Sequence, residues 1–327
     1  MHIGIAFDLK PDAPAATDLP DDWAEEFDSP VTVQAIAAAL KAKRHAVSEL
    51  GDGRELIQSL LKSPPDLVFN IAEGLGVGRS REARVPAVCE MLGVPYTGSD
   101  PLTLAAALDK DVARRLVASA GVKVPSAVLV HPGKSDSGFQ LRFPAIVKPA
   151  WEGSSKGIRG NSVASSFDQM VAVVAEQQRD YRQPLLVEEF IDGDELTVGI
   201  IGNDPARILG VMSVIPNRID GPFVYSLDVK RDFRNQVRYE CPARLAPETL
   251  AAVEKAALTA YRTLGCRDVA RIDFRMRDGV PYFIEANPLP GMNPESSDLV
   301  IMAGLVGLSH ADLIGMILDA AVERLSN

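Results

Sequence analysis

A stretch near the end of the chain, ARIDFRMRDGVPYFIEANPLPGMN (270–293), constrains the fold more than any other part of the sequence. Two runs of alternating polar and apolar residues flank the turn 277–279 and predict two antiparallel strands. Because strand side chains alternate between faces, a connecting loop of three or five residues puts the odd-numbered positions on one face. Those positions hold Arg271, Asp273, Glu285 and Asn287. We expect the opposite face to pack in the core, with Ile272, Phe274, Tyr282 and Ile284.

Two carboxylates and one amide on one strand face offer only oxygen ligands, a set that suits Mg²⁺ shared with substrate phosphates. The face is therefore a candidate metal and nucleotide site, with Asp273, Glu285 and Asn287 as ligands. A solvated strand face with an incidental charge pair is the alternative. The rigid turn from Asn287 to Met292 argues against it, because Gly291 there can present a backbone N–H to a reacting oxygen.

Two further segments carry candidate nucleotide contacts. In FPAIVKPAWEGSSKGI a buried strand delivers Lys148, and the Gly/Ser loop after it can turn backbone N–H groups toward a phosphate. The Walker A and GxGxxG spacings are absent, so the P-loop and Rossmann interpretations are excluded. In LLVEEFIDGDELTVG, carboxylates and main-chain groups can bind adenine and ribose. A plain surface turn and the solubility of an edge strand explain the two segments equally well in isolation.

The composition limits the partners and the compartment. A length of 327 residues predicts two or three domains with a cleft between them. A net charge of -10 argues against a nucleic-acid partner, which needs clustered basic residues. Cys89, Cys241 and Cys266 lie far apart, so neither a disulfide framework nor a zinc site is indicated. The chain lacks a signal peptide and an apolar run long enough to span a membrane, so we expect a cytoplasmic protein.

The first unit that we expect, 1–100, has strands at 2–7 and 66–71 alternating with helices at 31–45 and 81–92. This alternation is typical of a parallel α/β domain. The segment from Asp8 to Pro30, rich in Asp, Pro and Ala, is expected to be an acidic surface loop.

The second unit, 101–190, is expected to start with one long helix that carries Lys110 and ends at Gly121. A small α+β arrangement follows, with strands at 127–131, 145–148 and 185–190 and a helix at 166–179. The third unit, 191–327, has strands at 195–202 and 207–215, a polar stretch at 216–236, a helix at 247–264, the hairpin and closing helices.

Taken together and in order, these elements resemble the ATP-grasp fold of the D-alanine–D-alanine ligases. The resemblance rests on Lys110, Lys148, Glu152-Gly153-Ser154-Ser155, Val187-Glu188-Glu189, Glu195, Lys230, Arg271-Ile272-Asp273 and Glu285-Ala286-Asn287. It covers most of the chain from Phe69 onward. It implies a fold of the α/β and α+β class, in which a parallel α/β (pre-ATP-grasp) domain precedes the two ATP-grasp subdomains.

The same resemblance implies a carboxylate–amine ligase that works through an acyl phosphate, uses ATP and two Mg²⁺ ions, which Mn²⁺ could replace, and forms a homodimer. The nucleotide would be bound by Lys110, Lys148, Ser155, Glu188, Glu189, Ile191 and Glu195, and the metals by Asp273, Glu285 and Asn287. Lys230 would sit in a lid over the γ-phosphate. Catalysis would also involve Ser154, Arg271 and the Gly291 N–H, and Arg271 with Ser296 would hold the carboxylate of the second substrate.

Departures from the family pattern lie mainly at the first-substrate site. Glu73 stands where the family has His, Arg231 where the lid has Tyr, and Arg79 and Arg81 are added. Lys156 replaces a small apolar residue, and Glu26 or Asp28 is a candidate for the family's first-site Glu. New buried charges select a partner that neutralises them. We therefore expect a larger or more polar first carboxylate than D-alanine, with Glu73, Arg79 and Arg231 near it.

Three alternatives stay open. The enzyme could be an authentic D-alanine–D-alanine ligase of cell-wall synthesis, with Arg79 and Arg81 pointing to solvent. It could be an ATP-grasp phosphotransferase that stops at a phosphorylated product. A nucleotide-binding regulator without turnover is the third alternative, which the intact metal face and both lysines disfavour.

Overall fold

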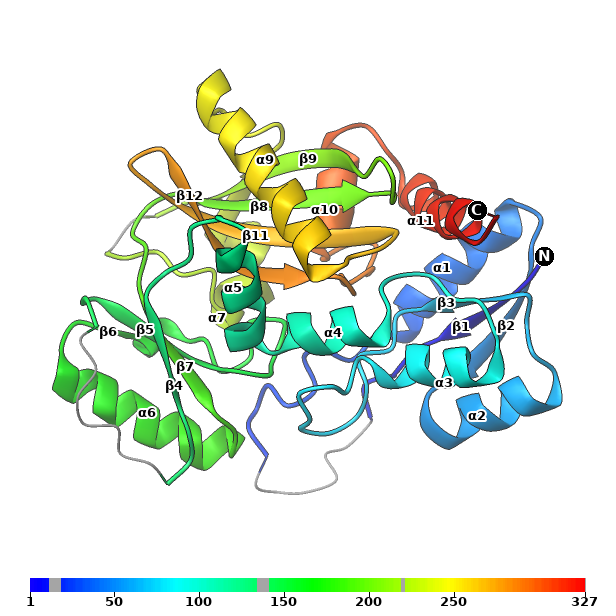
Figure 1. The fold of residues 1–327 in the computed structure, drawn as a ribbon, viewed down its shortest axis with the longest axis horizontal. Helices are drawn as coiled ribbons and strands as arrows, with labels where there is room; N and C mark the ends of the chain where they lie inside the picture. The colour runs from blue at the N-terminus through cyan, green and yellow to red at the C-terminus, as the bar shows by residue number, and fades with distance from the viewer. Residues whose placement is uncertain (12–18, 134–140, 219–220, 327) are drawn as a thin grey trace.

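The computed structural model describes residues 1–11, 19–133, 141–218 and 221–326, and its elements form three sheets with helices packed around them (Figure 1). The first sheet is parallel, with strand order β2-β1-β3, and comprises β1 (His2–Ala6), β2 (Ala46–Gly51) and β3 (Leu67–Asn70). Its helices are α1 (Pro30–Ala42), α2 (Gly53–Lys62) and α3 (Arg84–Leu92). The expected parallel α/β domain is confirmed; β2 and α2 are additions that the sequence analysis did not identify.

The second sheet is antiparallel, with strand order β4-β7-β5-β6, and α6 packs against it (Figure 1). Its elements are β4 (Ala127–Val130), β5 (Ala145–Pro149), a short 3-10 turn (Gly160–Ser162), β6 (Val163–Ala164), α6 (Phe167–Tyr181) and β7 (Leu185–Glu189). The expected strands and helix are all present within one or two residues of their expected ends.

The third sheet is antiparallel, with order β10-β9-β8-β11-β12. Its strands are β8 (Glu195–Ile201), β9 (Arg207–Pro216), β10 (Val237–Glu240), β11 (Val269–Arg277) and β12 (Val280–Asn287). The helices of this half are α7 (Leu227–Arg231), α8 (Phe233–Gln236), α9 (Pro247–Leu264), α10 (Asp298–Leu305) and α11 (His310–Ser326). The stretch expected to be a polar lid therefore contains two short helices, α7 and α8.

The expected single helix from Pro101 to Gly121 is wrong, because the chain breaks at Asp109 into α4 (Pro101–Leu108) and α5 (Lys110–Ser119). The Asp109 side chain accepts a hydrogen bond from the Val112 N–H at 3.1 Å and so starts the second helix. Both helices pack against the third sheet and α9. The break puts Lys110 at the first position of α5, with its side chain buried against that sheet.

The hairpin of β11 and β12 pairs its strands through a bulge. Asp278 and Gly279 form a two-residue turn with positive φ angles of 52° and 75°, so Arg277 pairs with Val280. This register would not align two odd-numbered residues, but a shift between Asp273 and Phe274 restores the pair Asp273–Glu285. The expected core face is therefore wrong for Tyr282 and Ile284, whereas Phe283 and Ala286 are buried with Ile272 and Phe274.

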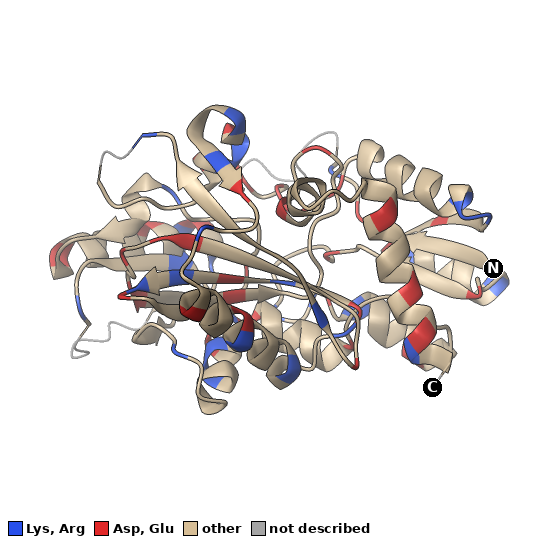
Figure 2. Ribbon diagram, turned by 90° about the horizontal axis from the view of Figure 1, so that it is seen from above, with Lys and Arg blue, Asp and Glu red and all other residues tan. Residues whose placement is uncertain are grey.

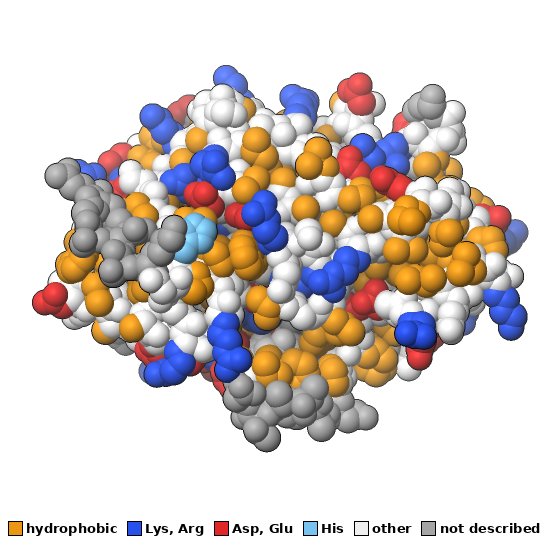
Figure 3. Space-filling view, turned by 60° about the horizontal axis from the view of Figure 1, so that its bottom comes forward, with side chains coloured by type: hydrophobic (Ala, Val, Ile, Leu, Met, Phe, Trp, Pro, Cys, Tyr) orange, Lys and Arg blue, Asp and Glu red, His pale blue; other side chains and the backbone are white. Residues whose placement is uncertain are grey.

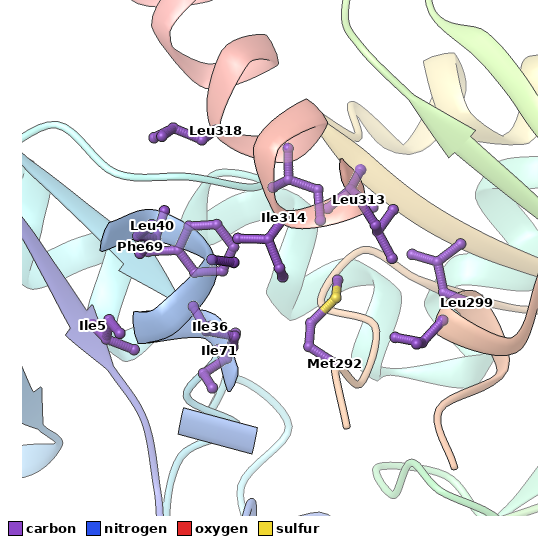
Figure 4. Packing of buried hydrophobic residues seen from close by; sticks show 14 of the residues in the cluster. Ile5, Ile36, Leu40, Phe69, Ile71, Met292, Leu299, Leu313, Ile314 and Leu318 are labelled. Atoms are coloured by element: carbon purple, nitrogen blue, oxygen red, sulfur yellow. The ribbon is translucent and has the colours of Figure 1, made fainter. Parts of the chain in front are cut away.

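The largest core joins the two ends of the chain. Figure 4 shows Ile36 and Leu40 of α1 meeting Ile314 and Leu318 of α11, with Phe69 of β3 beside them. The same cluster continues through Met292 and Leu299 toward the third sheet. Within the described parts of the chain, no single helix has the length and apolarity to cross a membrane; α10 and α11 would do so only as a pair bent by 107°.

Candidate active site

A cavity lies between the second and third sheets, where β5 and β7 face β8, β11 and β12. Ile146, Phe190, Phe274 and Ile284 form part of its apolar wall. The candidate nucleotide and metal residues that line it are Lys148, Ser155, Glu188, Glu189, Ile191, Glu195, Lys230, Asp273 and Glu285. Acidic and basic residues both lie on the strands in the middle of the molecule (Figure 2). An apolar slot edged by charges of both signs suits a base with an attached polyphosphate.

Lys148, which lines the cavity, and Lys110 beside it each pair with a carboxylate. Lys148 Nζ lies 2.6 Å from Glu188 Oε1, and Lys110 Nζ lies 2.6 Å from Glu285 Oε2, with all four side chains largely buried. Burial alone would raise the pKa of Glu285, but the ammonium groups of Lys110 and Lys148 hold it well below its usual range. Phosphates that enter this cavity can take over both lysines from their carboxylates.

Two arginines of β11 bind the carboxylates and a main-chain carbonyl near Phe190 and Ile191. Arg275 donates to Glu195 at 2.9 Å and to the Ile191 carbonyl at 2.6 Å, and its guanidinium lies 4.6 Å from the centre of the Phe190 ring. Arg277 donates to Glu189 at 2.7 Å. These contacts fix the carboxylates and the carbonyl on which adenine and ribose recognition would depend. The sequence analysis did not include either arginine in the site.

The candidate metal face brings Asp273, Glu285 and Asn287 together as expected. Asp273 pairs across the strands with Glu285, and Asn287 donates to Asp273 Oδ2 at 3.2 Å. The residues that the structure describes contain no group of three or more His, Cys, Asp and Glu arranged to hold a metal. Two carboxylates and an amide nevertheless fit Mg²⁺, which completes its shell with waters and substrate phosphates rather than with a protein cage.

A second cavity, of about 420 Å³, adjoins the first and extends toward the N-terminal domain. Of the candidate substrate and catalytic residues, it is lined by Glu73, Ser154, Lys230, Arg231, Arg271, Gly291 and Ser296. Ser154 and Ser155 have positive φ angles of 48° and 59°, a conformation that is rare outside glycine and concentrated at functional sites. The Ser155 hydroxyl donates to the Tyr225 carbonyl at 3.0 Å, which joins the Gly/Ser loop to the lid segment.

Arg271 pairs with two carboxylates of the protein. Its Nη2 lies 2.9 Å from Asp273 Oδ2 and its Nη1 lies 3.3 Å from Asp298 Oδ2. Ser296, the expected partner in holding a substrate carboxylate, is exposed and donates its backbone N–H to Asn293. Asp298 is a further residue that the sequence analysis missed. The available signal was an acidic residue at the first position of the helix that follows Ser296.

Residues 25–29 of the segment from Asp8 to Pro30 line the second cavity, and the expected role of the segment as a surface loop is wrong for its described residues Asp22 and Glu26. Asp22 is fully buried and accepts from the Gly157 N–H at 2.9 Å and the Tyr181 hydroxyl at 2.6 Å. Glu26 pairs with Arg81 at 2.7 Å. Positions 12–18 lie outside the described residues.

The added arginines have different environments. Arg81 is 2% exposed and contacts Glu26 and Glu152, and Lys156 pairs with the same two carboxylates. The Arg79 side chain is 62% exposed, at 3.7 Å from Asp109, so it points to solvent. Arg231 of the lid pairs with Asp21 and Glu25 of the N-terminal segment.

Glu73 lies at the junction of the second cavity with a third that also contains Glu82, Lys110, Asn287 and Gly291. Burial and the neighbouring Glu82 raise the pKa of Glu73 well above its usual range. Burial likewise raises the pKa of Glu82 to about 8. Both carboxyl groups line the third cavity, where burial favours the neutral form of each.

The similarity to known proteins agrees with this geometry. The family described as "D-ala D-ala ligase C-terminus" matches residues 117–319. The D-alanine–D-alanine ligase of Chelativorans sp. is 34% identical over 295 residues, which cover 88% of this chain and 91% of that one. An uncharacterized protein of Sinorhizobium fredii is 33% identical over 298 residues, with 88% and 87% covered.

Among solved structures, the D-alanine–D-alanine ligase from Bacillus anthracis complexed with ATP superposes with a TM-score of 0.74 at 22% identity, covering 99% and 98% of the two chains. That likeness confirms the ATP-grasp fold. With a relative above 30% identity along most of its length, the chain belongs to the D-alanine–D-alanine ligase family, whose members are ATP-dependent, ADP-forming ligases.

Proposed function

We propose that this ligase joins an amine to a first carboxylate other than D-alanine. The observation that carries the proposal is the polar lining of the second cavity, where the carboxyl groups of Glu25, Glu26, Asp28, Glu73 and Asp298 face Lys230, Arg231 and Arg271. Arg231 is already paired with Asp21 and Glu25. The methyl group of D-alanine offers no hydrogen-bond partner to the other polar groups of this cavity, and a buried polar group left without a partner costs free energy. A larger or more polar acid can meet these groups.

The residues support a two-step reaction. A carboxylate oxygen attacks the γ-phosphorus of ATP, the bond to the bridging oxygen breaks, and ADP leaves. The amine nitrogen then attacks the acyl carbon, the carbon–oxygen bond to phosphate breaks, and the proton of the amine leaves with the phosphate. Lys110, Lys148 and Lys230 would stabilise the phosphate charge, and the Gly291 N–H would stabilise the tetrahedral oxygen. Contacts of the lid with Ser155 would keep out water that hydrolyses an acyl phosphate.

We also propose that two Mg²⁺ ions bind with the nucleotide, where they neutralise phosphate charge. Asp273, Glu285 and Asn287 would hold them, since these side chains supply the oxygen atoms that Mg²⁺ prefers. Glu285 becomes available for this role once a phosphate takes Lys110 from it. Isothermal titration of the protein with ATP, with and without Mg²⁺, tests this coupling; equal affinity in both conditions contradicts it.

The test of the ligase is ADP release with a panel of carboxylates and amines, followed by mass measurement of the product. We expect release that requires both a carboxylate and an amine, and a product of their summed mass less one water. Release that needs no amine, with a phosphorylated product, would establish the phosphotransferase instead. A preferred carboxylate identical with D-alanine would contradict the proposed substrate.

We propose that the protein is a homodimer formed through its N-terminal domain. Hydrophobic side chains gather on the side of the molecule where α2 and α3 lie (Figure 3). Leu61 of α2 is 66% exposed and Met91 of α3 is 85% exposed, and apolar side chains that gather in one exposed patch mark interaction surfaces. Light scattering on the purified protein tests this, and a monomer at all micromolar concentrations would contradict it.

A further inference from the structure

We propose that Asp298 makes the second-substrate site select an amine that has no neighbouring carboxylate. This inference rests on the proposed ligase function. The amine substrate is expected to carry an N–H donor, a carboxamide or a second ammonium, where an amino acid carries its carboxylate.

The argument begins with the guanidinium of Arg271, which is engaged by carboxylates along two edges. Its Nε and Nη2 donate to Asp273 at 3.1 Å and 2.9 Å. Its Nη1 lies 3.3 Å from Asp298 Oδ2. The Arg271 side chain is 11% exposed, so these partners act in a largely water-free environment. One positive charge therefore faces two negative charges before any substrate arrives.

Burial and a hydrogen bond hold the Asp298 side chain in position. It is 7% exposed, and its Oδ1 accepts from the Tyr225 hydroxyl at 2.9 Å. The Tyr225 hydroxyl also lies 2.6 Å from the Tyr239 hydroxyl. Tyr225 precedes α7, and Tyr239 lies in β10. Asp298 lines both the nucleotide cavity and the substrate cavity. A substrate in either cavity can therefore contact Asp298 directly.

A substrate carboxylate next to Arg271 would meet the negative charge of Asp298 at close range. Divalent cations bound at Asp273 would neutralise the negative charge of that residue. The negative charge of Asp298 would remain and would repel the substrate carboxylate. A carboxylate has about four acceptor positions, of which the structure uses one on each oxygen of Asp298. An N–H donor on the substrate can occupy another, and the second cavity has the acidic character that favours such a group.

The bond chemistry is unchanged by this selection. The amine nitrogen forms its bond to the acyl carbon, the bond from that carbon to the phosphate oxygen breaks, and one amine proton leaves with the phosphate. Asp298 affects only the choice of the amine that binds in position for attack.

The experiment compares D-alanine and L-alanine with their carboxamides and with 1,3-diaminopropane, using the full chain, ATP, Mg²⁺ and the best carboxylate from the panel. The amine-dependent rate of ADP release gives kcat and KM for each amine. We expect kcat/KM to be at least about 10-fold higher for the carboxamide or the diamine than for alanine, which corresponds to about 1.4 kcal/mol. The difference should lie mainly in KM for the amine.

Asp298→Asn, which keeps the shape and removes the charge, should shift this ratio at least about 10-fold toward alanine, and Asp298→Ser should shift it in the same direction. Glu295→Gln is the matched control, because Glu295 lies three residues away with its side chain 71% exposed, and it should leave the ratio unchanged. A wild-type protein that prefers alanine, or an unchanged ratio in both Asp298 variants, overturns the inference. If no amine of either kind promotes ADP release, the proposed ligase function fails instead.

Discussion

At the scale of single residues, the lysines of the site form ion pairs with carboxylates, and a bound substrate must take the place of those carboxylates. Lys110 holds Glu285 and Lys148 holds Glu188, each at 2.6 Å. A phosphate is a better partner for both lysines, because it is a stronger and more highly charged acceptor. In the proposed function, nucleotide binding would free Glu285 for the metal ions and Glu188 for the base, so we expect binding of the metal and of the nucleotide to be coupled.

Asp273→Asn and Glu285→Gln should each abolish turnover and leave the fold intact, because each removes a metal-ligand charge but keeps the side-chain volume. Turnover and the thermal melting temperature are measured together. Glu176→Gln, at an exposed position of α6, is the control and should behave as wild type. Near-normal activity in both site variants would show that the metal assignment is wrong.

Lys230→Ala should slow the chemical step more than it weakens ATP binding. Lys230 lines both cavities from the end of α7, and a contact to the γ-phosphate counts mainly in the transition state. Single-turnover rates and ATP affinity separate the two effects. Lys255→Ala on the exposed face of α9 serves as the control. A loss of ATP affinity with an unchanged chemical rate would contradict this role.

Burial of Asp28 makes the free energy of unfolding depend on pH, with lower stability at high pH. Burial raises the pKa of Asp28 from 3.8 to about 7. The folded state therefore pays a penalty for ionising Asp28 that grows between about pH 4 and pH 7 and is complete above it. Asp28→Asn should raise the melting temperature by several degrees at pH 8.5 and by less at pH 5.5. An equal gain at both pH values would refute the shifted pKa.

At the scale of elements, the N-terminal segment and the Gly/Ser loop are held together by a buried cluster of charges. Glu26 and Glu152 share Arg81 and Lys156 as partners, and the Glu26 carboxylate also accepts from the Gly153 N–H. Ser154 and Ser155 follow directly in that loop. The cluster therefore sets the position of the substrate cavity relative to the phosphate end.

Arg81→Met should destabilise the protein by about 3 to 5 kcal/mol, because it leaves two buried carboxylates with Lys156 as their remaining cation. Arg79→Met, two residues away and exposed, should change stability by no more than about 0.5 kcal/mol. Urea unfolding measures both variants. Equal stability of the two would mean that the cluster does not hold the segment.

The hairpin shows which parts of an element can be predicted from its sequence. Period-two alternation put Asp273 on one face of its strand and Glu285 with Asn287 on one face of the next, but the expected loop of three or five residues is wrong, and a bulge brings the two sets together across a two-residue turn. It could not predict the bulge after Asp273, because a bulge is chosen by the strand β8 on the other side of β11 and by the core that receives Phe283. Asp109 is a similar case: its role as a helix start, rather than a mid-helix residue, depends on how α4 and α5 cover the third sheet.

At the scale of the whole molecule, the order of the motifs along the chain predicted the fold, and the contacts between distant segments could not be predicted. Arg81, Glu26 and Asp298 are examples, because their partners are contributed by other parts of the chain. The core shared by α1 and α11 (Figure 4) fixes the N-terminal domain against the last helix. The substrate cavity lies where these parts meet, so its charge reflects tertiary packing rather than any local motif.

The proposed function gives this member of the D-alanine–D-alanine ligase family substrates other than two molecules of D-alanine, as we propose above. The most direct measurement is a steady-state assay with D-alanine as the sole amino acid, at millimolar concentrations with ATP and Mg²⁺. The charged walls of the cavity predict a kcat/KM far below roughly 10⁴ M⁻¹s⁻¹. A kcat/KM at or above that value, with D-alanyl-D-alanine as the product, would contradict the account and identify an ordinary D-alanine–D-alanine ligase.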